Sequence, residues 1–149
     1  MSSATKIWFL KRIKLFENLD TDDMRILDER TRMAQVPRLK VIFESGEPGS
    51  SVYLLKSGRV KLSRVQGGRK LVLAILGPGE VFGEIGYIRE TERTADVRAM
   101  SQVSVLRFDY KRMQNDLKFF PNIVAKLNFN ISVILGERLA DMVENARKD

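Results

Sequence analysis

The stretch VFGEIGYIRETERTADV, residues 81–97, combines glycines, a carboxylate and an arginine in a pattern that predicts an anion-binding turn. Glycine has no Cβ, so the chain can turn and approach a ligand closely, and the N–H groups around Gly83, Ile85 and Gly86 can point at phosphate oxygens. Arg93 can add a bidentate positive charge to the same phosphate. We therefore expect this stretch to bind an anion.

Glu84 precedes Arg93 by nine residues and places a carboxylate in the same stretch. Two anions repel each other, so we expect Glu84 to accept a hydrogen bond from a hydroxyl group, such as a ribose 2′-OH, instead of contacting the phosphate. A nucleotide whose phosphate lies near its sugar carries both groups. A glycine-rich turn and an Arg-Thr pair also occur in ordinary connections between strands, but the full set at this spacing favours a binding site.

The runs FGEIG and RTADV resemble the phosphate-binding cassette of cyclic nucleotide-binding domains, in the form found in the catabolite-activator (CRP/FNR) superfamily. Residues 41–62, VIFESGEPGSSVYLLKSGRVKL, are similar to the opening strands of that family. Two positions depart from the common pattern, because Glu92 replaces a proline and Asp96 replaces Thr, Ser or Trp. The resemblance implies a mainly β fold with flanking helices: an antiparallel β-roll (double-stranded β-helix, jelly-roll-like) with N-terminal helices and a long C-terminal helix.

The same resemblance implies a ligand and a set of ligand-binding residues. The ligand is expected to be cyclic AMP or cyclic GMP, with no further cofactor and no metal. The implied roles are phosphate pairing by Arg93, a hydroxyl from Thr94, 2′-OH binding by Glu84, and backbone N–H groups from Gly83, Ile85 and Gly86. Alignment on Pro121 places Arg138 where relatives contact the base, so its planar guanidinium can stack on the purine or donate to a guanine carbonyl.

The length of the chain, 149 residues, suits a single cyclic nucleotide-binding domain spanning residues 1–149. We expect N-terminal helices in residues 1–35 and a β-roll in residues 36–108, with the phosphate-binding cassette at 81–97. C-terminal helices are expected in residues 109–149.

The chain contains no histidine and no cysteine. Iron-sulfur clusters need thiolates, haem usually needs His or Cys, and zinc enzymes and cysteine nucleophiles need the same residues. We therefore expect a regulatory module and not an enzyme. The alternative is a dimerisation or interaction domain with a degenerate pocket that binds no cyclic nucleotide.

The net charge of +7 comes from 26 basic and 19 acidic side chains and is spread along the chain. A nucleic-acid interface would concentrate Lys and Arg on one face, so we expect no DNA binding by this chain alone. No apolar run approaches the roughly 18 residues that a membrane-spanning helix needs, and the N-terminus does not read as a signal peptide. These features predict a cytoplasmic protein that does not bind membranes.

Local patterns predict the elements around the cassette. Residues 6–15 alternate apolar and basic side chains as a short amphipathic helix, and Asp20 is expected to cap a second helix that ends before Val36 and Pro37. Short strands separated by glycines follow, with a hairpin turn at residues 66–69. Asp109 is expected to cap a further helix, and a long helix is expected to begin at Pro121.

Apolar residues recur at three and four residue spacing along this last helix: Leu127, Ile131, Ile134, Leu135, Leu139, Met142 and Ala146. Such a seam predicts a partner helix, and the resemblance implies a homodimer through it. We expect Phe129 and Val133 to face the roll of the same chain. Ile131, Leu135 and Met142 would then be exposed in a monomer.

Overall fold

The structure is a computed structural model that describes residues 10–83 and 92–147. Residues Met1–Asp28 and Asp116–Asp149 form a helical unit, and residues Glu29–Asn115 form a β unit. Among the described residues, no helix is both long enough and apolar enough to cross a lipid bilayer.

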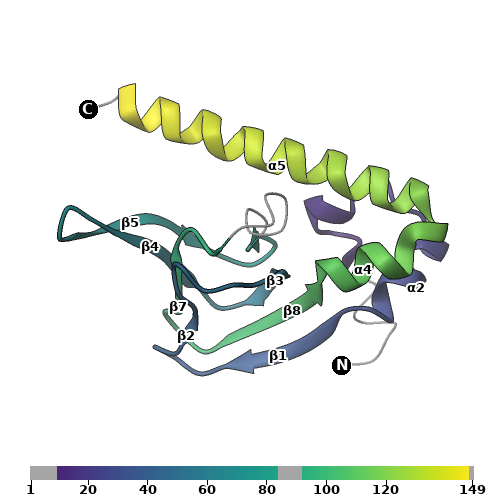
Figure 1. The fold of residues 1–149 in the computed structure, drawn as a ribbon, viewed down its shortest axis with the longest axis horizontal. Helices are drawn as coiled ribbons and strands as arrows, with labels where there is room; N and C mark the ends of the chain where they lie inside the picture. Colours follow the sequence, from purple (N-terminus) through teal and green to yellow (C-terminus); the bar gives the residue numbers. More distant parts are fainter. Residues whose placement is uncertain (1–9, 84–91, 148–149) are drawn as a thin grey trace. The chain divides into compact units, whose positions relative to one another are not determined.

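The β unit consists of two four-stranded antiparallel sheets (Figure 1). The first sheet has the order β1-β8-β3-β6, and its strands are β1 (Arg32–Val36), β8 (Val103–Asp109), β3 (Ser51–Ser57) and β6 (Val81–Phe82). The second sheet has the order β2-β7-β4-β5, and its strands are β2 (Val41–Phe43), β7 (Asp96–Ala99), β4 (Val60–Gln66) and β5 (Arg69–Leu76). The predicted antiparallel β-roll with flanking helices is confirmed.

The core of the β unit is built by side chains that alternate along the strands of both sheets. It contains Phe43, Leu55, Val60, Leu76, Phe82, Val97, Ala99, Val103 and Val105. On β7, Val97 and Ala99 are fully buried, whereas Asp96 and Arg98 are only partly buried. Asp96 and Arg98 therefore lie on the outer face of the second sheet.

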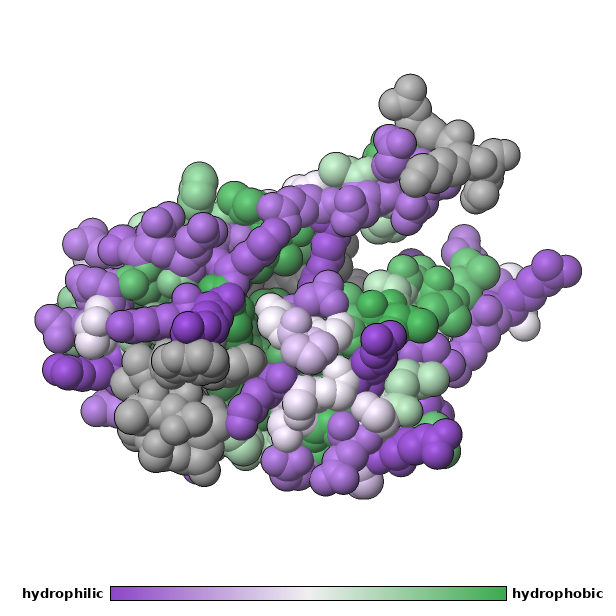
Figure 2. Space-filling view, turned by 180° about the vertical axis from the view of Figure 1, so that it is seen from behind, coloured by the Kyte–Doolittle hydropathy of each residue, from purple (hydrophilic) through white to green (hydrophobic). Residues whose placement is uncertain are grey.

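Strands β4 and β5 form a hairpin whose turn is the one predicted from the sequence. Gln66 pairs with Arg69, and Gly67 and Gly68 between them have φ angles of +59° and +76°. Only glycine adopts two successive positive φ angles without steric cost, so the turn depends on this pair. The hairpin also carries exposed apolar side chains, and Figure 2 shows a green patch over it: Val65, Leu71, Val72, Leu73 and Ile75.

The first described helices belong to the helical unit. A 3-10 helix, η1 (Lys14–Phe16), precedes α2 (Thr21–Asp28). Asp20 caps α2 as predicted, because its carboxylate accepts the N–H of Asp23 at 2.8 Å while Asp23 accepts the N–H of Asp20 at 3.2 Å. This reciprocal pair satisfies two backbone donors at the start of the helix.

The C-terminal part of the chain contains α4 (Tyr110–Asp116), η2 (Leu117–Phe119) and α5 (Pro121–Arg147). Asp109 caps α4 as predicted, since its carboxylate accepts the N–H of Arg112 at 3.2 Å. The long helix begins at Pro121 as predicted and extends for 27 residues. Proline is favoured at the first position of a helix, where its missing N–H needs no partner.

Two sequence predictions about the N-terminal region require correction. The expected helices of residues 1–35 end at Asp28, and Arg32–Val36 is strand β1, which pairs along β8. Tertiary pairing decides this segment, because Ala and Gln give little local preference for a strand. Residues 6–9 of the expected first helix lie outside the described residues, and the remainder includes turns and η1 in place of one continuous helix.

The apolar seam predicted on α5 is also corrected. Ile131 is 1% exposed within the chain and is therefore not available to a partner, whereas Phe129 is 65% exposed. The buried face is centred on Asn130, whose Nδ2 donates to the carbonyls of Leu15 and Glu17 at 2.8 Å each. A polar side chain thus fixes which face of α5 packs on η1.

Replacing Asn130 by Ala should destabilise the chain by about 2 kcal/mol, because the carbonyls of Leu15 and Glu17 would lose their donor in a buried environment. Chemical denaturation measures this loss. The matched control is Asn122→Ala, which removes the same side chain from an exposed position of α5 and should change stability by less than about 0.5 kcal/mol. Equal stability of the two variants would contradict this role for Asn130.

Candidate functional site

Arg93 is anchored through its own backbone just before β7. Its N–H donates to the carbonyl of Glu47 at 2.8 Å, and its carbonyl accepts the N–H of Gly46 at 2.9 Å. These bonds tie the residue to the loop that follows β2. The position of the Arg93 side chain is therefore set by backbone pairing on two sides of the residue.

The guanidinium of Arg93 is buried in the β unit, and the residue is only 5% exposed. Nη1 donates to the carbonyl of Gly83 at 3.1 Å, and Nη2 donates to the carbonyl of Ser51 at 3.0 Å. The guanidinium carbon lies 4.2 Å from the centroid of the Phe43 ring, within the range of a cation–π interaction. Carbonyl dipoles and an aromatic face thus hold a permanent positive charge in a fixed orientation.

Phe43 belongs to an aromatic group beneath this charge. Its ring centroid lies 5.9 Å from that of Tyr53 and 6.2 Å from that of Phe82, and the Tyr53 and Phe82 rings stack at 4.9 Å. Phe82 is fully buried and belongs to the core of the roll. The aromatic group therefore connects the Arg93 guanidinium to the main apolar core.

Two glycines allow the backbone to approach the guanidinium. A Cβ at Gly49 would lie 2.6 Å from Nε of Arg93, and a Cβ at Gly83 would lie 2.8 Å from the carbonyl oxygen of Ser51. Gly83 also has a φ of +87°, a conformation that strains any residue with a side chain. The close packing around Arg93 therefore requires glycine at both positions.

The structure brings together only part of the residue set predicted for the site. Gly83 contacts Arg93 through its carbonyl, and Thr94 is exposed beside it. Glu84, Ile85 and Gly86 lie outside the described residues. Arg138 is partly buried in α5 of the helical unit, so its contact with a base stays a prediction.

Three residues that hold Arg93 were not identified as site residues from the sequence: Phe43, Gly49 and Ser51. Ser51 acts through its backbone carbonyl, which leaves no signature in the side chain. Gly49 has no positive φ, so turn geometry does not explain it. The only sequence feature that marks Gly49 is its position in the run FESGEPGS, next to a predicted strand end. Its proximity to Arg93 arises from the tertiary fold and could not be predicted from that run.

Asp96, one of the two departures from the family pattern, has a structural contact. Its Oδ1 accepts the N–H of Ser45 at 2.7 Å. Ser45 immediately precedes Gly46, which bonds to the Arg93 carbonyl. The Asp96 carboxylate therefore fixes the loop that also holds Arg93.

The sequence was compared with protein families and with known proteins. The family described as "Cyclic nucleotide-binding domain" matches residues 33–118. The "Cyclic AMP receptor protein" of Thermus thermophilus is 33% identical over 136 residues, which cover 89% of this chain and 60% of that protein. The chain thus spans less than two thirds of the length of this relative.

Known structures show the same fold. The N-terminal domain of a transcriptional regulator from Streptomyces coelicolor superposes with a TM-score of 0.75 at 29% identity, covering 90% of this chain and 94% of that one. A cyclic nucleotide-binding domain from Methylobacillus flagellatus superposes with a TM-score of 0.85 at 19% identity, covering 96% of this chain and 81% of that one. The sequence matches indicate the family, and the superpositions show that the roll architecture is shared with these known structures.

Replacing Gly83 by Ala should destabilise the chain more than replacing Gly79 by Ala. Both glycines have positive φ angles, +87° and +89°, but a Cβ at Gly79 meets no atom within 4 Å. The Gly79→Ala loss should be about 1 kcal/mol from backbone strain alone, and Gly83→Ala should exceed it by at least about 1 kcal/mol from the contact with the Ser51 carbonyl. Thermal denaturation compares the two, and equal losses would contradict the close packing.

Proposed function

This chain belongs to the cyclic nucleotide-binding domain family, and from that membership we propose that it is a regulatory module that binds a cyclic nucleotide at Arg93 and performs no chemistry of its own. The observation that carries the proposal is the buried guanidinium, held by the carbonyls of Gly83 and Ser51 over the Phe43 ring. A fixed, desolvated cation pairs with a phosphate at a small cost in side-chain entropy.

The remaining ligand contacts are proposed from the family resemblance of the cassette, because residues 84–91 lie outside the described residues. Arg93 pairs with the cyclic phosphate and Thr94, beside it and exposed, donates its hydroxyl to the same group. Gly83, Ile85 and Gly86 direct backbone N–H groups toward the phosphate, and Glu84 accepts the ribose 2′-OH. Arg138 is proposed to stack on the purine or to donate to a guanine carbonyl.

The ligand is proposed to be cyclic AMP, with cyclic GMP also bound. The Thermus thermophilus relative is named for cyclic AMP, and the matched family is defined by cyclic nucleotides in general. A hydroxyl such as that of Thr94 can accept a hydrogen bond from the guanine 2-amino group, which adenine lacks. This residue is proposed to allow cyclic GMP to bind without excluding cyclic AMP.

The output is proposed to be transcription regulation in the cytoplasm, as part of a CRP/FNR-type regulator. The relative with 60% coverage is longer than this chain, and the Streptomyces coelicolor domain is the N-terminal part of a transcriptional regulator. Ligand binding can change the output only if it favours one of two conformations. The element proposed to shift between the two conformations is α5. This chain by itself is proposed not to bind DNA.

Replacing Arg93 by Lys should lower the affinity for cyclic AMP by at least about tenfold, because an ammonium keeps the charge but cannot reproduce the bidentate geometry of a guanidinium. Isothermal titration calorimetry of the folded variant measures the loss. The control is Arg107→Lys, an exposed position on β8, where affinity should not change. Wild-type affinity in Arg93→Lys would refute the phosphate site, and no binding by the wild-type chain would favour a degenerate pocket.

A homodimer through α5 is the second part of the proposal. The last turns of α5 expose apolar side chains, with exposed fractions of 62% for Leu139, 63% for Met142 and 54% for Val143. Exposed stripes of this kind are uncommon on monomeric proteins and typically mark contact surfaces. Because Ile131 and Ile134 are buried within the chain, the proposed contact lies in the C-terminal half of α5.

The double variant Leu139→Glu and Met142→Glu should dissociate this dimer, since burying unpaired carboxylates in an apolar contact is costly. Sedimentation velocity across a concentration range measures the change. Asn128→Glu, exposed and outside the apolar stripe, is the control and should remain dimeric. A wild-type chain that sediments as a monomer at every concentration would refute the dimer.

A further inference from the structure

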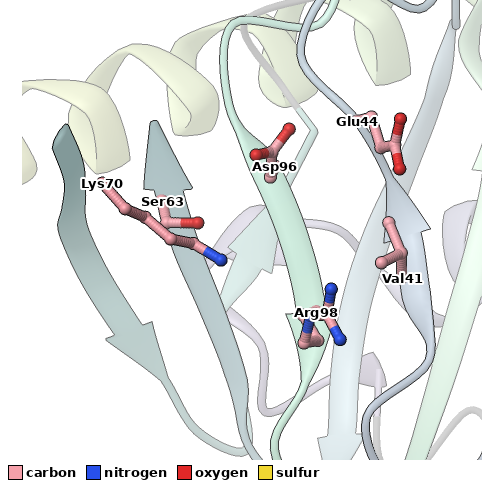
Figure 3. A pocket seen from close by; sticks show the side chains of 6 residues that line it. All are labelled: Val41, Glu44, Ser63, Lys70, Asp96 and Arg98. Carbon is pink, nitrogen blue, oxygen red and sulfur yellow. The ribbon is translucent and has the colours of Figure 1, made fainter. Parts of the chain in front are cut away.

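The outer face of the second sheet contains a small cavity that is separate from the Arg93 guanidinium. Its volume is about 50 Å³, and it is lined by Val41, Glu44, Ser63, Lys70, Asp96 and Arg98. Figure 3 shows that these side chains come from β2, β4, β5, β7 and the residue that follows β2. The cross-strand register places Ser63 opposite Asp96, which brings the floor of the cavity together.

The lining of the cavity contains two positive and two negative side chains that form no direct ion pairs with one another. Among residues 10–83 and 92–147, no ion pair joins Lys70 or Arg98 to Glu44 or Asp96. Arg98 donates to the carbonyl of Leu39 at 3.1 Å, and Asp96 accepts from Ser45, so both are held in place by backbone groups. Asp96 and Arg98 therefore have fixed positions in the lining, whereas Lys70 and Glu44 are exposed side chains at its edge.

Ser63 adds a buried polar group to this arrangement. The residue is only 2% exposed, and its hydroxyl has no hydrogen-bond partner in the part of the chain that the structure describes. The hydroxyl oxygen is not fully enclosed by protein, so water or a molecule in the cavity can form a hydrogen bond with it. Lys70 and Ser63 lie on neighbouring strands, and each carries a group that can donate a hydrogen bond (Figure 3).

The balance of charge restricts what the cavity can bind. A simple anion would approach two carboxylates, and a simple cation would approach two cationic side chains. A molecule with an ammonium and a carboxylate on neighbouring atoms avoids both conflicts. Its ammonium would donate to Asp96 and Glu44, and its carboxylate would accept from Arg98, Lys70 and Ser63.

The geometry points to a binding site for the zwitterionic main chain of a free α-amino acid at this cavity. A water molecule needs roughly 10–15 Å³ of such space, so the cavity holds the few heavy atoms of glycine but not a large side chain. A larger amino acid would have to direct its side chain toward solvent. The lining of this site does not include Arg93, so the site can be tested in the absence of a cyclic nucleotide.

Titration of the labelled chain with glycine, followed by proton-nitrogen correlation spectra, tests the site. Saturable shifts are expected at the amides of Ser45, Ser63 and Arg98. Glycine betaine should give none, because its methylated ammonium cannot donate hydrogen bonds. Absence of saturable shifts with glycine, or equal shifts with inorganic phosphate or magnesium chloride, would overturn the inference.

Two variants locate the binding within the cavity. Asp96→Asn keeps an oxygen for the Ser45 N–H but removes the negative charge, and should weaken glycine binding about tenfold. Lys70→Gln changes an exposed side chain, should weaken binding in the same direction and keeps the test available if Asp96→Asn does not fold. Arg64→Gln, an exposed control on β4, should bind like wild type.

Arg93→Lys separates this inference from the cyclic nucleotide site, because it should lose cyclic AMP affinity and retain glycine binding. Unchanged glycine affinity in both Asp96→Asn and Lys70→Gln would show that glycine binds elsewhere.

Discussion

The burial of one guanidinium is the constraint on which this β unit depends. Removing a charge from water is expensive, so Arg93 can be buried only where fixed dipoles surround it. The carbonyls of Gly83 and Ser51 and the ring of Phe43 supply that environment from three separate segments of the chain. The candidate site is therefore part of the core, and a substitution at Arg93 is expected to affect folding as well as the proposed ligand binding.

This constraint explains the glycines next to Arg93 without reference to a ligand. Gly49 and Gly83 are needed because a Cβ at either position would occupy space next to the guanidinium or its acceptor. The backbone bonds of Arg93 to Gly46 and Glu47 fix the loop on the other side. A glycine in this region therefore reflects close packing around a buried cation as much as contact with a phosphate.

The sequence predicted the elements whose causes are local and missed those set by distant partners. The turn at Gly67 and Gly68 and the caps at Asp20 and Asp109 depend on neighbouring residues, and all were confirmed. Strand β1 depends on β8, far along the chain, and was expected to be helical. The first half of the predicted α5 seam was wrong, because Ile131 is buried beside Asn130, a polar residue that distant carbonyls satisfy, whereas Met142 is exposed as expected.

The loop after β2 connects the two proposed sites. Asp96 binds the N–H of Ser45, and the next two residues, Gly46 and Glu47, pair with the backbone of Arg93. An amino acid bound to the Asp96 carboxylate would compete with the Ser45 N–H for this acceptor. Such competition would change the free energy of the loop that positions Arg93. Coupling between two sites is reciprocal, so a cyclic phosphate that fixes Arg93 must then change the affinity for the amino acid by the same factor.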